Sequence, residues 1–390
     1  MQTRREFLRN AAALSGTAFV LGSIPEAIAK AVAIDPEKGT TFLDAEHVVV
    51  LMQENRSFDH CYGALQGVRG FRDPRAHLLP GGDAVWFQAD GKGDVYAPFR
   101  LDIKETNVTW IGGLPHSWPD QVDARNGGRY DKWLIAKHRD DLPMAMGHYS
   151  RADIPFYYAL ADAFTVCDYA FCSSLTGTTP NRLFLWTGTI RKDAADFPRV
   201  QNGDTDYDAE AAWTTYPERL ESAGVSWRIY QNEISLDTGL NGDEDNWLSN
   251  FTDNPIEWFS QYNVRFSKKH REQLDRLVES LPQEIATKEA QSPRTEKLTK
   301  EIEGLKSRLK NAETERKIWT EAAWNALTPR GKALHEKAFC TNEGDPHYRE
   351  LTPLKHRDGD VEREIAVPKG DVLYRFRKDV DEGKLPAVSW

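Results

Sequence analysis

The sequence predicts an α/β fold with a mainly parallel sheet. One observation is the apolar run at residues 48–51, which is typical of a strand covered on both faces. A second is the alternation of strand-like and helix-like stretches, as where a helix near 216–223 precedes a strand over 224–230. A third is the length of 390 residues, which suits one large α/β domain with insertions, or two domains.

A long charged segment over residues 268–340 interrupts this alternation. Apolar residues recur there at helical spacing in two series, namely Leu274, Leu277, Leu281 and Ile285, and then Leu298, Ile302, Leu305 and Leu309. Pro293 separates the two series, so we expect an inserted helical hairpin. With so few heptads, we expect its apolar stripe to pack on the body of the domain. A coiled-coil dimer arm or a lid over the site is the alternative.

The N-terminus has the three parts of an export signal. Arg4 and Arg5 stand in TRREFL, the weakly apolar stretch AAALSGTAFVLGSI follows, and small residues end the segment at Ala27 and Ala29. The paired arginines indicate a twin-arginine signal over residues 1–33, which predicts a periplasmic or secreted protein and the twin-arginine export machinery as a partner. A short helix that stays attached to the protein is the alternative.

Composition excludes some partners. The net charge of −10 is a poor match for a nucleic-acid backbone and for simple adsorption to anionic lipid. No segment reaches the roughly 20 apolar residues of a transmembrane helix. The four cysteines allow three disulfide connectivities, and free thiols are equally compatible with the sequence.

The stretch HVVVLMQENRSF, residues 47–58, places polar side chains directly after a predicted strand. In open α/β sheets, ligands bind in the crevice beyond the carboxyl ends of the strands, so Glu54 and Asn55 stand where a site is expected. A solvated turn would explain the same residues.

A second stretch, SSLTGTTPNRLFLWTGT, spans residues 173–189. Pro180 suits the first turn of a helix, because the N–H that it lacks is not needed there. Thr178 and Thr179 then lie at the helix N-terminus, where the helix dipole attracts a phosphate-like anion and stabilises an alkoxide. Such a hydroxyl suits a nucleophile in phosphoryl transfer, although Thr-Thr-Pro is also a good helix cap.

Together, HVVVLMQENRSFDHCYG, TGTTPNRLFLWTGT and LPHSW resemble the bacterial phospholipase C and acid phosphatase family of the alkaline-phosphatase-like superfamily. The resemblance covers nearly all of residues 40–390. It implies an alkaline-phosphatase-like three-layer sandwich. Matched to the family motifs, Thr178 is the nucleophile, His116 lines the pocket, and Glu54 and Asn55 form a metal or phosphate site.

The resemblance also assigns roles to other motif residues. Asn181 and Arg182 complete the nucleophile motif as phosphate-binding residues, with Arg182 as a structural partner in the alternative. Asp59 and His60 are expected to buttress the loop after Glu54, and His347 is a further candidate only by its position after the insertion. The cofactor implied is one divalent metal ion, whose identity two oxygen ligands do not specify.

The implied activity is that of an exported phospholipase C, which hydrolyses phosphatidylcholine-type lipids at a membrane surface to diacylglycerol and phosphocholine. One alternative is an acid phosphatase, which would use the same chemistry to hydrolyse soluble phosphate monoesters. The other alternative, from a different functional class, is a remnant of such an enzyme that has no catalytic activity.

The chain also departs from the family pattern. Family members continue past the strand that begins at LPAVSW into an acidic segment that completes the site, and no such segment follows here. Residues 40–390 therefore resemble a partial catalytic domain without the C-terminal part of the fold. We expect the chain alone to be aggregation-prone and to have little phosphodiesterase activity.

Overall fold

The computed structural model describes residues 25–390 except 36, 107, 109–111, 139–141 and 359. The described residues divide into two compact units. Unit 1 comprises those within 1–45, 53–177 and 355–364, and unit 2 comprises 46–52, 178–354 and 365–390. Arg4 and Arg5 of the predicted export signal lie outside the described residues.

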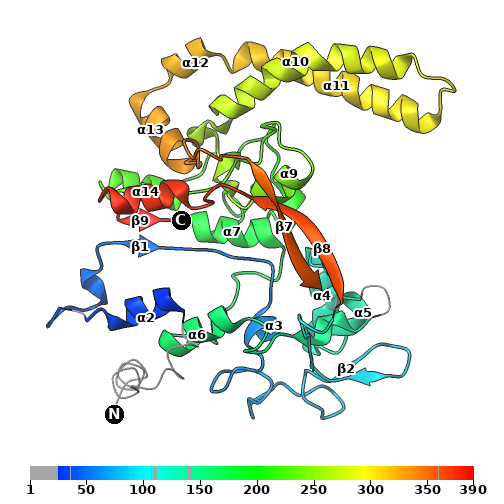
Figure 1. The fold of residues 1–390 in the computed structure, drawn as a ribbon, viewed down its shortest axis with the longest axis vertical. Helices are drawn as coiled ribbons and strands as arrows, with labels where there is room; N and C mark the ends of the chain where they lie inside the picture. Colours follow the sequence, from blue (N-terminus) through cyan, green and yellow to red (C-terminus); the bar gives the residue numbers. More distant parts are fainter. Residues whose placement is uncertain (1–24, 36, 107, 109–111, 139–141, 359) are drawn as a thin grey trace. The chain divides into compact units, whose positions relative to one another are not determined.

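Unit 1 consists of short helices and short β-pairs joined by loops (Figure 1). Its elements are α2 (Glu26–Ala33), the 3-10 helix η2 (Phe42–Asp44), α3 (Phe58–Tyr62), β2 (Gln88–Ala89), β3 (Val95–Tyr96), β4 (Phe99–Arg100), α4 (Trp118–Arg125), η4 (Asn126–Gly128), α5 (Trp133–Ala136), η5 (Met144–Met146), β5 (Gly147–His148) and α6 (Pro155–Ala163). Strands β2 and β3 pair antiparallel, whereas β4 and β5 pair parallel. Helix α2, which contains Ala27 and Ala29 of the predicted export signal, packs on α6 through Ile28 and Val32.

Unit 2 contains the larger core and most of the longer helices. Its elements are β1 (Val48–Val49), α7 (Thr178–Thr187), η6 (Asn202–Asp204), α8 (Tyr216–Ser222), β6 (Trp227–Arg228), α9 (Asp243–Leu248), η7 (Pro255–Trp258), η8 (Ser260–Tyr262), η9 (Val264–Phe266), α10 (Lys268–Glu289), α11 (Glu296–Ile318), α12 (Glu321–Ala326), α13 (Pro329–Ala338), α14 (Tyr374–Asp381) and β9 (Val388–Ser389). The antiparallel hairpin of β7 (Leu351–Asp358) and β8 (Val361–Pro368) has residues in both units.

A three-stranded sheet in the order β1-β9-β6 lies in unit 2. Figure 1 labels two of its strands, the neighbours β1 and β9. Both pairings are parallel, with Val388 opposite Val48 on one side and Trp227 on the other. The prediction of a mixed α/β fold with a mainly parallel sheet is therefore confirmed at this level, while the three-layer sandwich stays a prediction.

One expectation about this sheet is wrong. Val48 and Val49 are 51% and 48% exposed, so β1 is not covered on both faces. Strand β1 is only two residues long and has a partner, β9, on one side within the described sheet. An apolar run alone does not distinguish such an edge strand from a buried one.

Helix α7 is anchored in the core of unit 2. Leu183 and Trp186, one turn apart, are buried in a cluster with Trp227, Trp258 and other apolar side chains of this unit. The helix is followed by Gly188 at φ 74°, whose N–H donates to the Phe184 carbonyl at 2.9 Å, as in a glycine-terminated helix. This packing places the first turn of α7, with Thr178, at the margin of a rigid core.

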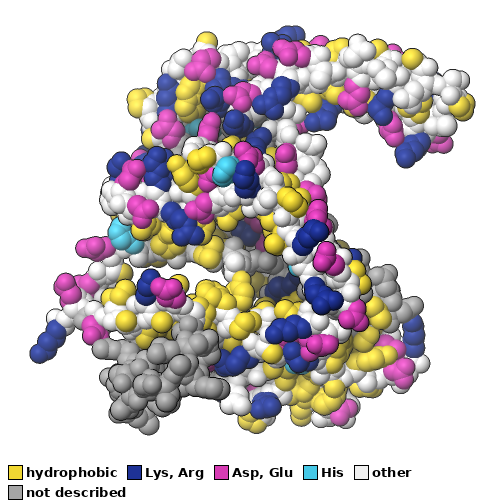
Figure 2. Space-filling model, in the orientation of Figure 1, with side chains coloured by type: hydrophobic (Ala, Val, Ile, Leu, Met, Phe, Trp, Pro, Cys, Tyr) yellow, Lys and Arg dark blue, Asp and Glu magenta, His cyan; other side chains and the backbone are white. Residues whose placement is uncertain are grey.

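Helices α10 and α11 form the predicted hairpin, which projects as a pair of long helices in Figure 1. Its apolar stripes pack on each other and not on the body of the domain, which corrects our expectation. The buried set is Leu274, Leu277, Leu281, Ile285, Leu298, Ile302 and Ala312. Its surface carries interspersed positive and negative side chains (Figure 2). At its base, the His270 imidazole contacts the Asp237 carbonyl at 2.9 Å.

No described helix is both long and apolar enough to span a bilayer.

Candidate functional site

Thr178 is the first residue of α7, and Pro180 is the third. The first N–H groups of a helix have no partner within it, and the helix dipole is positive at this end. The Thr178 side chain is partly buried, and none of the hydrogen bonds among the described residues involves its hydroxyl. This hydroxyl therefore lies at the positive end of the helix dipole, which stabilises negative charge.

Thr179 has the opposite environment, although it is the next residue. Its side chain is fully buried, and its hydroxyl lies 3.3 Å from the hydroxyl of Thr252. Its backbone N–H donates to Oδ1 of Asn202 at 3.0 Å. Thr179 therefore has the contacts of a structural residue, whereas no hydrogen bond among the described residues involves the Thr178 hydroxyl.

Arg182 lies one turn further along α7 and is buried. Its Nη1 donates to the backbone carbonyl of Asp253 at 2.9 Å, and its Nη2 lies 3.4 Å from the Asp253 carboxylate. These contacts connect α7 to the turn before η7, as expected for the alternative in which Arg182 is a structural partner. Asn181 is partly buried in the same turn of the helix. The assignment of both residues to phosphate binding stays a prediction.

Glu54 and Asn55 belong to unit 1 and lie in the exposed loop before α3. Ser57 caps α3, with its hydroxyl accepting from the His60 N–H at 3.3 Å. The Glu54 carboxylate and the Asn55 amide supply two hard oxygen donors, which suit a cation such as Mg²⁺ or Ca²⁺. The described residues contain no cluster of three or more His, Cys, Asp or Glu side chains able to hold a metal ion. These two oxygens fit part of a divalent site.

The predicted buttressing role of His60 agrees with its geometry. Its Nδ1 lies 2.9 Å from the Gly147 carbonyl of β5, which ties the start of α3 to that strand. Burial lowers the pKa of His60, and the positive charge of Arg56 lowers it further. His60 therefore favours its neutral form.

His116 is exposed in unit 1, immediately before α4. Its Nδ1 lies 2.6 Å from the Leu114 carbonyl. Because a carbonyl only accepts, Nδ1 carries the proton in this contact and Nε2 is left for another partner. The neighbouring Ser117 and Asp120 form a capping box that fixes the start of α4. His347, the weaker candidate, is exposed in unit 2, with Nδ1 3.1 Å from the Glu350 carboxylate.

The acidic residue of η7, Glu257, is buried. The Glu257 side chain is fully buried, and its two carboxyl oxygens lie 3.1 and 3.0 Å from the Ser235 N–H. The Tyr207 hydroxyl lies 3.3 Å from it. Burial raises the pKa of Glu257 to about 8, so this carboxyl is mostly protonated at neutral pH.

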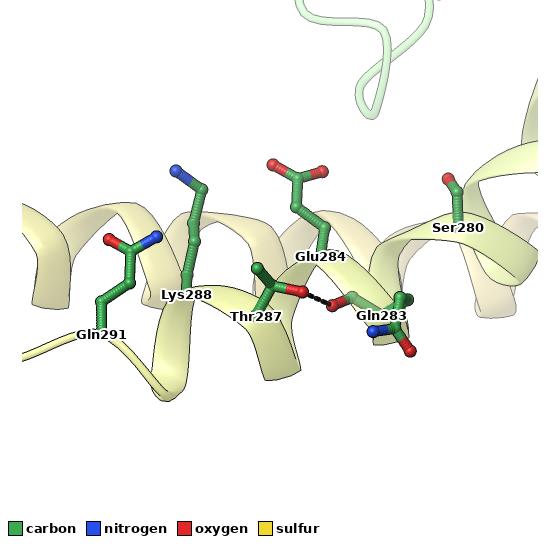
Figure 3. Close-up of a pocket in the computed structure, with 6 residues that line it drawn as sticks. All are labelled: Ser280, Gln283, Glu284, Thr287, Lys288 and Gln291. Atoms are coloured by element: carbon green, nitrogen blue, oxygen red, sulfur yellow. Dashed lines mark hydrogen bonds between the residues drawn. The ribbon is translucent and has the colours of Figure 1, made fainter.

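The hollow shown in Figure 3 has no role in this chemistry. Six side chains of α10 and the residues just after it line the hollow, which are Ser280, Gln283, Glu284, Thr287, Lys288 and Gln291. The Thr287 hydroxyl bonds to the Gln283 carbonyl of its own helix at 2.8 Å. None of the predicted site residues lies there.

The predicted site residues are thus divided between the units. Thr178, Asn181 and Arg182 share the first turns of α7 in unit 2, and Glu54, Asn55 and His116 lie in unit 1. Sequence reasoning missed three residues that contact α7, namely Asn202, Thr252 and Asp253. No local pattern marks them, because 23 to 73 residues separate each from its partner.

Within the part of the chain that the structure describes, Thr178 places a hydroxyl without a hydrogen-bond partner at the start of a core-anchored helix, an arrangement that is compatible with phosphate-ester chemistry. The profile of the Phosphoesterase family matches residues 45–288, and this chain belongs to that family.

Its relatives include bacterial phospholipases C. The chain is 44% identical over 268 residues to the non-hemolytic phospholipase C of Pseudomonas aeruginosa, an alignment that covers 67% of this chain and 36% of that protein. It is 43% identical over 270 residues to the non-hemolytic phospholipase C of Burkholderia pseudomallei, covering 67% and 37% of the two proteins. It is 39% identical over 243 residues to phospholipase C B of Mycobacterium tuberculosis, covering 60% and 46%. The alignments thus span less than half of each relative.

Proposed function

We propose that this chain is part of an exported phospholipase C, which cleaves the phosphodiester of phosphatidylcholine-type lipids with Thr178 as the nucleophile. The observation that carries this proposal is a contrast within one helix turn: among the described residues no hydrogen bond involves the Thr178 hydroxyl, whereas the Thr179 side chain is buried and hydrogen-bonded. The similarity to phospholipases C supports the choice of a lipid phosphodiester. For the complete fold, we propose the alkaline-phosphatase-like sandwich.

In the proposed reaction, the Thr178 hydroxyl loses its proton and its Oγ forms a bond to phosphorus while the bond from phosphorus to the glycerol oxygen breaks. The glycerol oxygen takes up a proton and leaves as diacylglycerol, and the headgroup phosphate stays on Thr178. Water then attacks phosphorus, which releases phosphocholine and returns the proton to Oγ. The positive end of the α7 helix dipole stabilises the negative charge of the phosphoryl group in both steps.

The residues of unit 1 have supporting roles in this proposal. His116 binds the phosphoryl group or protonates the leaving oxygen through Nε2, which requires the imidazolium form, because Nδ1–H already donates to Leu114. Glu54 and Asn55 are the residues that would hold a divalent cation, which would supply positive charge for phosphate-ester chemistry.

A substrate comparison tests the lipid assignment. The full-length product of the gene that encodes this chain is incubated with phosphatidylcholine vesicles and, separately, with p-nitrophenyl phosphate. We expect phosphocholine release from the vesicles to dominate. Substantial hydrolysis of the monoester without phosphocholine release would favour the acid phosphatase and exclude the lipase.

We also propose export by the twin-arginine route. A fusion of residues 1–33 to a reporter should be exported, and replacing both Arg4 and Arg5 with lysine should abolish export. Replacing Lys30 with arginine is a matched control that keeps the charge of the segment and should leave export intact. Unchanged export of the double lysine variant would count against this route.

A further inference from the structure

The turn between α9 and η7 is the most unusual backbone segment next to α7. Phe251 and Thr252 have φ angles of 53° and 65°, a left-handed conformation that is uncommon for an aromatic residue and worse for a β-branched one. The Phe251 side chain is 57% exposed, so core packing does not explain its conformation. Strain of this kind persists only where other contacts hold the backbone in place.

Hydrogen bonds involving Ser235 and Asn250 hold the backbone of this turn in place. The Thr252 N–H donates to the Ser235 hydroxyl at 2.8 Å, and the Asp253 N–H donates to the Asn250 carbonyl at 2.9 Å. Oδ1 of Asn250 also accepts from the N–H of buried Asn254 at 2.8 Å. These hydrogen bonds therefore hold the backbone of the turn in its left-handed conformation.

The same turn contacts α7 at two points. The Thr252 hydroxyl lies 3.3 Å from the Thr179 hydroxyl, and the Asp253 carbonyl accepts from Arg182 at 2.9 Å. Thr179 and Arg182 are both buried, and they flank the first turn of the helix. Movement of the turn would therefore move the helix start.

We propose that the turn Phe251–Asp253 is a positioning element that fixes the first turn of α7, and that Thr252 sets the placement of the neighbouring Thr178 hydroxyl through Thr179. This inference rests on the proposed role of Thr178 for its effect on catalysis. Thr252 itself is a positioning residue, because its hydroxyl contacts Thr179. A nucleophile displaced by a fraction of an ångström loses rate without losing substrate affinity.

Two variants of Thr252 test the proposal in the full-length protein. Thr252→Val keeps the branched shape and removes the hydroxyl, and Thr252→Ser keeps the hydroxyl. For Thr252→Val, we expect kcat for phosphocholine release to fall by about 10-fold or more, with KM changed less than about twofold. Thr252→Ser should restore kcat. Thr287→Val, which removes a hydroxyl on the exposed face of α10, is the control and should leave kcat unchanged.

Amide hydrogen exchange supplies a readout that needs no activity. Thr252→Val should accelerate exchange at the Asn181 and Arg182 amides, and Thr252→Ser should not. If exchange there is unchanged in Thr252→Val, the positioning role is wrong, whether or not kcat falls. If exchange accelerates but Thr178→Ala retains activity, the turn does position α7 and the proposed nucleophile is wrong.

Discussion

The α10–α11 hairpin and the first turn of α7 are held in place by different forces. The hairpin is stabilised by an apolar seam between two helices that are adjacent in the sequence. The start of α7 is fixed by polar contacts to Asn202 of η6 and to Thr252 and Asp253 of the turn before η7, which lie 23 to 73 residues from their partners in the sequence. Burial of apolar area is tolerant of small shifts, whereas hydrogen bonds specify the positions of individual atoms.

This difference accounts for where the candidate chemistry lies. A hydroxyl that must attack phosphorus in line needs a defined position, and directional contacts around α7 can define it. The hairpin has a large apolar seam but none of the predicted site residues. Its stability and the activity of the protein should therefore respond to different substitutions.

The largest expected effect comes from the two adjacent threonines. Thr178→Ala should lower the rate of phosphocholine release by at least about 10³-fold, because it removes the nucleophile, and it should leave the unfolding midpoint nearly unchanged. Thr179→Ala should instead destabilise unit 2 by about 1–3 kcal/mol, since the Thr252 hydroxyl loses its partner. Rates and urea unfolding of both variants check this. The reverse pattern would mean that the assigned hydroxyl is the wrong one.

The next effect concerns the hairpin. Leu281 is 2% exposed in the seam, so Leu281→Ala should destabilise the hairpin by about 2–5 kcal/mol. Faster amide exchange along α10 and α11, with unchanged exchange at the start of α7, is the expected result. Glu303→Ala on the exposed face of α11 is the control and should change stability by less than about 0.5 kcal/mol. Equal acceleration in α7 would show that the two regions are coupled.

A smaller effect should appear in the pH dependence of unit 2. Burial raises the pKa of Glu257 to about 8, so between the usual carboxyl pKa and 8 the folded state binds more protons than the unfolded state. Stability should therefore fall as pH rises from about 5 to 8. Glu257→Gln stays neutral and should flatten this slope, measured as the urea midpoint against pH. The same slope in wild type and variant would show that Glu257 is not the group responsible.

Local patterns in the sequence were sufficient for several elements. Leucine spacing predicted α10 and α11, Pro180 predicted the start of α7, and the stretch 216–230 predicted α8 and β6. The β7–β8 hairpin was missed, as were the exposure of β1 and the packing of the hairpin stripes on each other. Exposure and packing partners depend on which segments meet in space, and periodicity does not contain that information.

The candidate site was predictable only in part. The motif around Thr178 marked the helix start, but the residues that hold it became visible only in three dimensions, because Thr252 lies 73 residues from Thr179. The roles of Glu54, Asn55, His116, Asn181 and Arg182 still rest on the family motifs. The twin-arginine signal also stays a prediction.

The most direct test of the account is to trap the intermediate. The full-length protein is mixed with phosphatidylcholine vesicles, quenched in acid within the first turnovers, digested and analysed by mass spectrometry. The account predicts a phosphocholine adduct on the peptide that contains Thr178, localised to that residue by fragmentation and absent from Thr178→Ala. An adduct on a different residue, or rapid phosphocholine release by Thr178→Ala, would contradict it.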